Sequence, residues 1–433
     1  MEYWDIFKLS TRTTAITLRD GQVMEAKTGF DESTSGRAFV NGAWAYRTVP
    51  SESNERILSQ ELLEQARRLS RQVEPFELAT ANFGKNFVTK AAFRPSEVSL
   101  EEKIRRLMEL DKAARELPVH TQLYYIDIEQ SSFLNAEHRE LEQTLIKCGV
   151  FLNCVAREGD LLQHMSVSHR QSEGWETIAN LPNSFSRDCA KRAVSLLSAK
   201  PAPAGKKTVV LDPLLVGVFT HEAIGHMTEG DFTANHDTIL EGRIGEQIAS
   251  SLVTIVDDKT LPQGFGSFGI DREGTAAERT SLIENGRLTG LMNSRTSGGK
   301  LGQRATANCR GEFNAVRMSN TVMVPGKTDP QELIRETKDG VYLIGSGGGT
   351  ASTTSGVFNF AALEGYLIEN GELTTHLRDV ALLGNTLETL KSIDLVGSDF
   401  LMGSGTCGKS GEGAPVGDGG PTIRTVALVG GRS

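Results

Sequence analysis

Residues 220–231 read THEAIGHMTEGD and place two histidines, His221 and His226, five positions apart with Glu222 directly after the first. The pattern differs by one residue from H-E-x-x-H, in which two histidines four positions apart share one face of a helix and bind zinc. In a regular helix, four steps return a side chain to within about 40° of its start, whereas five overshoot to about 140°. The two imidazoles can therefore meet at one metal only if the turn is widened by one residue, as in a π-bulge.

Gly225, immediately before His226, is the residue that tolerates such a distortion. The alternative is a chance pattern on a buried helix. With 8 His and 55 acidic residues among 433, roughly 0.02 occurrences of His-acid-x-x-x-His are expected per chain, so chance is a weak explanation. Asp212 and Pro213 resemble a helix start, with the acid as N-cap and proline in the first turn. The stretch therefore predicts a metal site on a distorted helix that runs from about Pro213 to Glu229.

The length and composition indicate a soluble globular protein of two or three domains. The chain has 433 residues, of which 38% are hydrophobic and 23% charged. No stretch approaches the roughly 18 apolar residues of a membrane helix, and the N-terminus lacks the features of a secretory signal. Five cysteines at irregular spacing favour reduced thiols over a disulfide framework. We therefore expect a cytoplasmic protein that does not bind membranes.

The charge of the chain argues against nucleic acid as a partner. The formal net charge is −9, and no segment is rich in lysine and arginine. Binding to a phosphate backbone requires a basic patch, because the phosphates must be neutralised. The sequence therefore predicts no nucleic-acid binding.

The first half of the chain alternates strand and helix patterns. Residues 1–49 read as a β-meander with tight turns at Asp20-Gly21 and Asn41-Gly42. Helices are predicted at about 59–70, after a capping box that opens at Ser99, and at about 184–198. Strands are predicted at 121–129, 147–155 and 161–168. Strands grouped together with helices between them indicate an α+β domain.

Residues 200–207 contain two prolines and a glycine and are the clearest candidate for a linker. We place the domain boundary there, with an N-terminal α+β domain at 1–203 and a C-terminal β-rich catalytic domain at 204–433. Beyond Gly242, strand-like segments alternate with predicted turns, among them Asp257-Asp258 and Asn285-Gly286, and one helix is predicted at about 330–339. The second half thus predicts a curled or barrel-like β-structure that carries the metal-binding helix.

A catalytic zinc site usually has three protein ligands, so a third ligand is needed. Cys407 is the most suggestive candidate, because flanking glycines let the backbone approach a metal and nearby Lys409 would favour the thiolate. The alternative is a free cysteine in a loop. Three competing ligands lie nearer in sequence: Asp231, Glu229 and His236.

Several motifs, taken in order, resemble one known family. They are the segments 221–231, 317–321, 347–349, 366–371, 407–409 and 415–417. Together they closely resemble the TldD branch of the TldD/PmbA peptidase family, which has been labelled "modulator of DNA gyrase". The resemblance implies that His221 and His226 bind zinc, that Cys407 is the third ligand and that Glu222 is the catalytic glutamate. The PmbA (TldE) branch resembles a metal-free paralogue that lacks the His-Glu motif.

Two hypotheses of function follow. In the first, the protein is a zinc-dependent peptidase that hydrolyses unfolded or short peptides with metal-activated water and Glu222 as general base. In the second, it is an assembly subunit whose metal is structural or absent and which supports a catalytic paralogue. A glutamate beside the first ligand has no obvious use in a structural site, which favours the peptidase. The resemblance also implies a dimer, either of this chain or with a TldE/PmbA-like paralogue.

Overall fold

The first three strands form the predicted meander. The computed structural model describes residues 1–51, 53–136, 139–311, 314–409 and 411–431. Strands β1 (Glu2–Arg19), β2 (Gln22–Val40) and β3 (Ala43–Val49) pair antiparallel. Asp20-Gly21 and Asn41-Gly42 both have positive φ, as a tight hairpin turn requires. These two turns confirm the sequence prediction.

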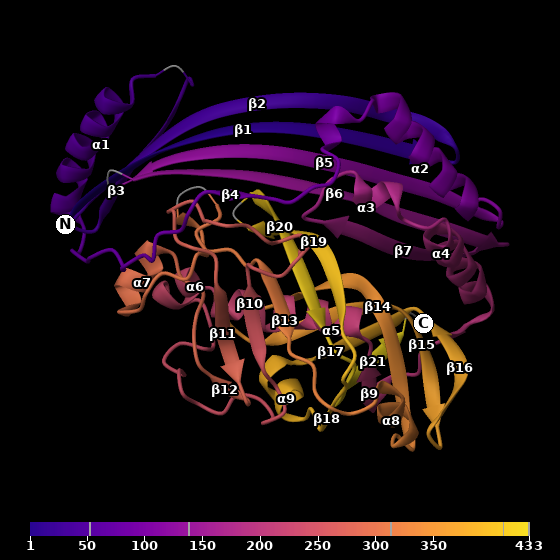
Figure 1. Ribbon diagram of the computed structural model, residues 1–433. Helices are drawn as coiled ribbons and strands as arrows, with labels where there is room; N and C mark the ends of the chain where they lie inside the picture. Colours follow the sequence, from indigo (N-terminus) through magenta and orange to yellow (C-terminus); the bar gives the residue numbers. More distant parts are fainter. Residues whose placement is uncertain (52, 137–138, 312–313, 410, 432–433) are drawn as a thin grey trace.

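The meander belongs to a seven-stranded sheet that arches over the second half of the chain (Figure 1). Its strand order is β3-β2-β1-β5-β6-β4, with β7 paired to β6. The added strands are β4 (Phe87–Val88), β5 (Val119–Ala136), β6 (Arg139–Glu158) and β7 (Leu161–Gln171). The strands predicted at 121–129, 147–155 and 161–168 lie inside the last three of these.

Four helices accompany this sheet: α1 (Glu55–Leu69), α2 (Leu100–Ala114), α3 (Glu176–Ala179) and α4 (Ser184–Ser195). Single 3₁₀ turns lie at Ser70–Gln72, Pro95–Glu97 and Leu196–Ser198. The Ser99 hydroxyl accepts from the Glu102 N–H and starts α2, as the sequence predicts. Leu107 of α2, Leu152 of β6 and Ala190 of α4 are buried in one apolar cluster. The first half is therefore an α+β structure, which confirms the predicted class.

Five strands of the second half close into a barrel. They are β9 (Gly205–Leu211), β14 (Asp339–Ala351), β15 (Val357–Glu369), β17 (Val380–Asn385) and β21 (Ile423–Gly431). The pairing runs β14-β9-β21-β17-β15 and returns to β14. Three short strands extend the sheet: β8 (Lys200–Pro201), β16 (Glu372–Arg378) and β18 (Leu395–Val396). The barrel-like prediction is confirmed, but much of the predicted linker at 200–207 lies in β8 and β9. The domain boundary at 203/204 stays a prediction.

A second sheet of six strands lies beside the barrel, in the order β12-β11-β10-β13-β20-β19. Its members are β10 (Ile255–Asp258), β11 (Arg279–Glu284), β12 (Arg287–Leu288), β13 (Asn320–Met323), β19 (Leu401–Lys409) and β20 (Glu412–Gly420). The turn predicted at Asp257-Asp258 is wrong, because both residues lie in β10. Asp257 is tolerated in a buried strand because Lys259 pairs with it at 2.9 Å and Ser319 donates to it.

Helix α5 (Pro213–Thr220) lies between the barrel and the six-stranded sheet. The Asp212 carboxylate accepts from the Leu215 N–H at its start, as predicted. Phe219 packs edge-on against Phe358 and Phe360 of β15, with ring centroids 5.4 and 6.1 Å apart. On the other side, a Cβ at Gly217 would lie 2.8 Å from a backbone nitrogen of β20, so glycine permits the close approach. This packing fixes the end of the helix beside β19 and β20.

Four short helices complete the second half: α6 (Gly230–Ala234), α7 (Arg295–Leu301), α8 (Pro330–Arg335) and α9 (Thr386–Lys391). Beyond Gly242 the sequence predicts only the helix near 330–339, and α7 and α9 show that this prediction of a single helix is wrong. Helices α7 and α9 have seven and six residues and start at side-chain caps, Ser294 and Asn385. Such short helices show too little periodicity to be recognised. In the described parts of the chain, no helix is long and apolar enough to span a membrane.

Candidate metal centre

The helix that carries the two histidines widens where the sequence predicts it. Helix α5 ends at Thr220, and His221–Gly225 continues as a turn of π-helix before a 3₁₀ turn at His226–Thr228. The His226 N–H donates to the carbonyl oxygen of His221, five residues earlier. The extra residue in this turn brings both imidazoles to one side of the helix. The predicted distortion is confirmed.

Gly225 has a different role from the one that its position suggests. Its backbone angles, φ −52° and ψ −56°, are ordinary for a helix, so the turn needs no special conformational freedom there. A Cβ at this position would lie 2.0 Å from Sδ of Met318. Glycine therefore provides room for the neighbouring methionine rather than an unusual φ.

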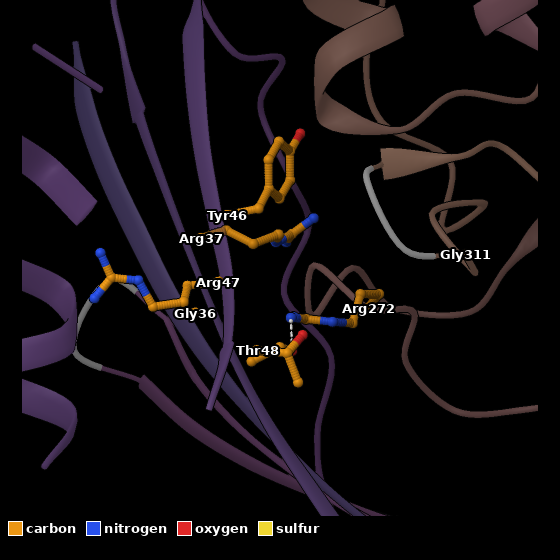
Figure 2. A pocket seen from close by; sticks show the side chains of 8 residues that line it. Gly36, Arg37, Tyr46, Arg47, Thr48, Arg272 and Gly311 are labelled. Atoms are coloured by element: carbon orange, nitrogen blue, oxygen red, sulfur yellow. Dashed lines mark hydrogen bonds between the residues drawn. The ribbon is translucent and has the colours of Figure 1, made fainter. Parts of the chain in front are cut away.

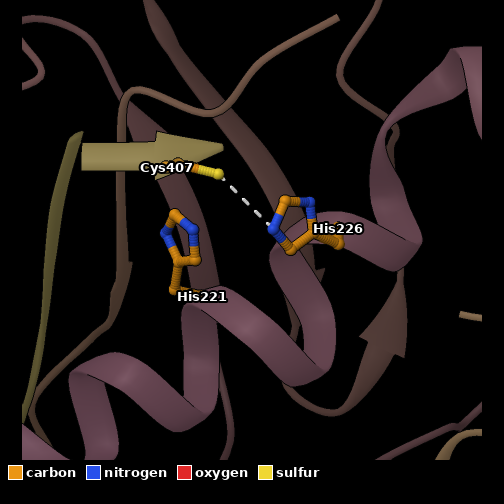
Figure 3. Close-up of side chains that lie close together, drawn as sticks. All are labelled: His221, His226 and Cys407. Carbon is orange, nitrogen blue, oxygen red and sulfur yellow. Dashed lines mark hydrogen bonds between the residues drawn. The ribbon is translucent and has the colours of Figure 1, made fainter. Parts of the chain in front are cut away.

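The ligand atoms of His221, His226 and Cys407 lie within 4.8 Å of one another. Figure 3 shows the two imidazoles on the helix and the thiol on the neighbouring strand, which is β19. The imidazole rings are nearly perpendicular, with centroids 5.2 Å apart, and Sγ of Cys407 lies 3.5 Å from Nε2 of His226. A separation of 181 residues in sequence is thus closed by the contact of α5 with the β19–β20 hairpin.

This group of donors fits zinc. Imidazole nitrogen and thiolate sulfur are ligands that zinc prefers, and three protein ligands are the usual number in a catalytic site. Nδ1 of His221 is buried and has no hydrogen-bond partner among the described residues. A buried polar atom normally has a partner, so this nitrogen is left available for a metal or for the contacts that orient one.

Electrostatics favour the metal-binding forms of His221 and Cys407, whereas a metal would have to displace the proton that His226 holds. Burial and the nearby His226 lower the pKa of His221 to about 3, so its imidazole is neutral. Burial opposes a charge on His226, but hydrogen bonds with Cys407 and Glu229 outweigh it and raise its pKa to about 10. Burial also opposes a charge on Cys407, but His226 and Arg317 lower the pKa of its thiol. A thiolate is the form of cysteine that binds zinc.

Two of the competing ligands hold the site in place instead. Glu229 is fully buried, and its Oε2 lies 3.1 Å from Nδ1 of His226. This contact leaves Nε2 of His226 facing Cys407, as expected for a carboxylate that orients a metal-binding histidine. Lys409 joins Glu229 to Asp231, with Nζ 2.9 and 2.8 Å from their oxygens. His236, the third competitor, is exposed and pairs with Glu241.

The groups that stabilise the thiolate are not the predicted one. Lys409 is engaged by Glu229 and Asp231. The pKa of the Cys407 thiol is lowered by His226 first and then by the buried Arg317, which also donates to the carbonyl oxygen of Cys407. The expectation for Lys409 is therefore wrong. That expectation was based on the closeness of Lys409 to Cys407 in the sequence, whereas Arg317 lies 90 residues from Cys407.

Glu222 lies on the same side of the helix as the donors. Oε2 of Glu222 is 3.9 Å from Nε2 of His226, and its side chain is 26% exposed. Burial raises the pKa of Glu222, and burial together with Glu222 raises the pKa of Asp418 to about 7. Asp418 lies on β20 in a glycine-rich segment, and nothing in its sequence context connects it with Glu222. A partly accessible carboxylate beside a His-His-Cys group is the arrangement of a metallopeptidase.

Comparison with known proteins agrees with this class. Models described as PmbA/TldA metallopeptidase domain 1, central domain and C-terminal domain match residues 4–70, 93–198 and 204–430. A metalloprotease of Methanothermobacter thermautotrophicus is 41% identical over 100% of this chain and 96% of the relative. A zinc metalloprotease TldD homolog of Saccharolobus solfataricus is 34% identical over 70% of this chain and 69% of the relative. The chain belongs to the PmbA/TldD metallopeptidase family.

The fold is also that of a solved structure. A Thermotoga maritima protein labelled a modulator of a DNA gyrase superimposes with a TM-score of 0.81. The match covers 99% of this chain and 96% of that one at 22% sequence identity. At this identity the similarity concerns the fold alone.

Proposed function

We propose that the protein is a zinc-dependent peptidase in which His221, His226 and Cys407 hold the metal and Glu222 is the general base. The convergence of these three donors beside the Glu222 carboxylate carries the proposal. When bound, zinc supplies polarisation of the scissile carbonyl and acidifies a water molecule. The name of the relative from Saccharolobus solfataricus supports zinc as the metal.

Glu222 performs the proton transfers in this proposal. Its carboxylate accepts a proton from the attacking water and passes that proton to the leaving amine. Burial raises its pKa and makes it a stronger base than an exposed glutamate. An assembly subunit with a structural metal would have no use for this carboxylate, so the geometry favours the peptidase.

Strand β19 offers a way to bind a peptide beside the donors. It forms the edge of its sheet, where it pairs with β20, and no described strand pairs with its other edge. Cys407 lies on this strand, with Gly403, Gly405 and Gly408 near it. An extended peptide added to such an edge is held by backbone hydrogen bonds, which read little sequence. The proposed substrates are therefore unfolded or short peptides.

The first expected result is metal-dependent hydrolysis of an unstructured peptide. Chelation should abolish cleavage, and zinc should restore it, whereas magnesium should not, because magnesium prefers oxygen ligands over imidazole and thiolate. The rate is measured by mass spectrometry of the products, with the metal content determined in the same samples. Full activity in protein shown to lack metal would reject the proposal.

The second expected result concerns assembly. We propose a dimer, either of this chain or with a metal-free paralogue, that encloses the active sites. Residues 22–33 of β2 lie beyond the reach of β3, and Met24 and Phe30 on this stretch are 56% and 64% exposed. An unpaired strand edge with exposed apolar side chains is a surface on which another chain can pair. Light scattering should show a dimer, and a stable active monomer would contradict the proposal.

A further inference from the structure

A cavity of about 660 Å³ separates the N-terminal sheet from the β19–β20 hairpin. Alternate side chains of β6 line one wall, and Phe268, Arg310 and residues 412–415 of the hairpin line the other. The side chains contributed by β6 are Gln143, Leu145 and Lys147. The cavity thus lies between the N-terminal sheet and the β19–β20 hairpin, on which β19 carries Cys407. Figure 1 shows this hairpin under the arched sheet.

Two cationic side chains in this cavity, Lys147 and Arg310, have no acidic partner among the described residues. Lys147 is 5% exposed, and its Nζ donates to the carbonyl oxygens of Phe265 and Ser267. Arg310 donates to the carbonyl oxygens of Met318 and Pro415. No carboxylate in the described residues forms an ion pair with either cation. Burial and the nearby charge of Arg310 lower the pKa of Lys147, because a second positive charge is unfavourable where little solvent is present.

Arg272 and Asp271, which also line the cavity, have partners of their own. Nη1 of Arg272 lies 3.0 Å from Oδ1 of Asp5, and the Asp5 carboxylate also pairs with Arg37. Arg272 and Arg37 border a smaller adjoining pocket of about 180 Å³, shown in Figure 2. Asp271 accepts from three backbone N–H groups, those of Glu273, Thr275 and Cys309.

Two acidic groups bear on Lys147 and Arg310. Asp257 acts on Arg310 electrostatically, but it is paired with Lys259 at 2.9 Å. Glu412 also lines the cavity, and a carboxylate there disfavours an anion bound directly beside it. Lys147 and Arg310 are therefore the pair that a bound anion would neutralise.

We propose that this cavity is a carboxylate-binding subsite for the peptide, in which Lys147 and Arg310 together receive a C-terminal carboxylate or an acidic side chain. The identification of the ligand as a peptide rests on the proposed function. Nη2 of Arg310 lies 2.8 Å from the carbonyl oxygen of Pro415 on β20. The preceding residue, Ala414, is the cross-strand neighbour of Cys407. Because paired strands lie about 4.8 Å apart, a peptide held here lies close to the metal centre.

The test uses three labelled peptides that differ only at their C-terminal end. One has a free carboxylate and no acidic residue, the second is its amide, and the third is the amide with one glutamate near the end. Binding is measured by fluorescence anisotropy on full-length, zinc-loaded Glu222→Gln protein. We expect the free acid to bind about tenfold or more tightly than the plain amide, as for hydrogen bonds to a charged group. The third peptide distinguishes a C-terminal carboxylate from an acidic side chain.

Lys147→Met should remove most of this preference, whereas Lys191→Met, at an exposed lysine paired with Asp188, should retain it. A purely structural role for Lys147 would weaken all three peptides equally, and that result would overturn the proposal. Equal affinity of the intact site for all three peptides would also overturn it, whether or not the Lys147 variant folds. Hydrolysis by wild-type protein is measured separately. Absent hydrolysis with preserved carboxylate preference would reject the peptidase and leave the anion subsite standing.

Discussion

Glu222→Gln is expected to reduce hydrolysis of an unstructured peptide by about 10²–10⁴-fold, mainly in kcat, while zinc content stays unchanged. The amide has nearly the size of the carboxylate, and Glu222 is not one of the three converging donors. The glutamine amide cannot accept the proton of a water molecule at neutral pH. Peptide binding should therefore persist while the proton transfer is lost.

The control for this change is Glu241→Gln, which alters an exposed glutamate that pairs with His236 and is not one of the converging donors. Its rate should equal that of wild type. Both variants are compared at matched zinc occupancy, so that a difference in rate cannot arise from metal loss. Equal rates for wild type and Glu222→Gln would contradict the peptidase mechanism and favour the hypothesis that the protein is an assembly subunit.

Cys407→Ala should lower zinc from about one per chain to a small fraction, and activity should fall with it. A site that loses one of three protein ligands loses most of its affinity, since the two imidazoles alone hold the metal weakly. Cys154→Ala is the matched control, because this buried cysteine belongs to the core of the N-terminal half. It should cost stability and leave zinc unchanged. Elemental analysis that finds normal zinc in Cys407→Ala would assign the third ligand to a carboxylate such as Asp231.

The sequence was most informative where spacing alone imposes a geometric condition. Two histidines five residues apart cannot converge on a regular helix, so the π turn at 221–225 followed from elementary helix geometry. The turns at Asp20-Gly21 and Asn41-Gly42 followed from residue preferences in the same way. Each of these features depends on neighbours in the sequence.

Features that depend on distant contacts could not be predicted from residue patterns. The sequence around Arg317 does not indicate that this residue acts on Cys407, because the contact spans 90 residues. Asp257 resembles a turn residue until Lys259 and Ser319 supply its partners. Cys407 was a candidate from its glycine-rich surroundings, but its assignment as a ligand came from family resemblance. The fold then placed its sulfur 3.5 Å from Nε2 of His226.

X-ray absorption at the zinc edge of the purified wild-type protein tests the central claim most directly, because it reports the ligand atoms themselves. The account predicts about one zinc per chain, with one sulfur at about 2.3 Å, two imidazole nitrogens at about 2.0–2.1 Å and one further light atom from water. The sulfur shell should be absent from any residual zinc in Cys407→Ala. A wild-type spectrum with only nitrogen and oxygen neighbours would contradict the His221, His226 and Cys407 site.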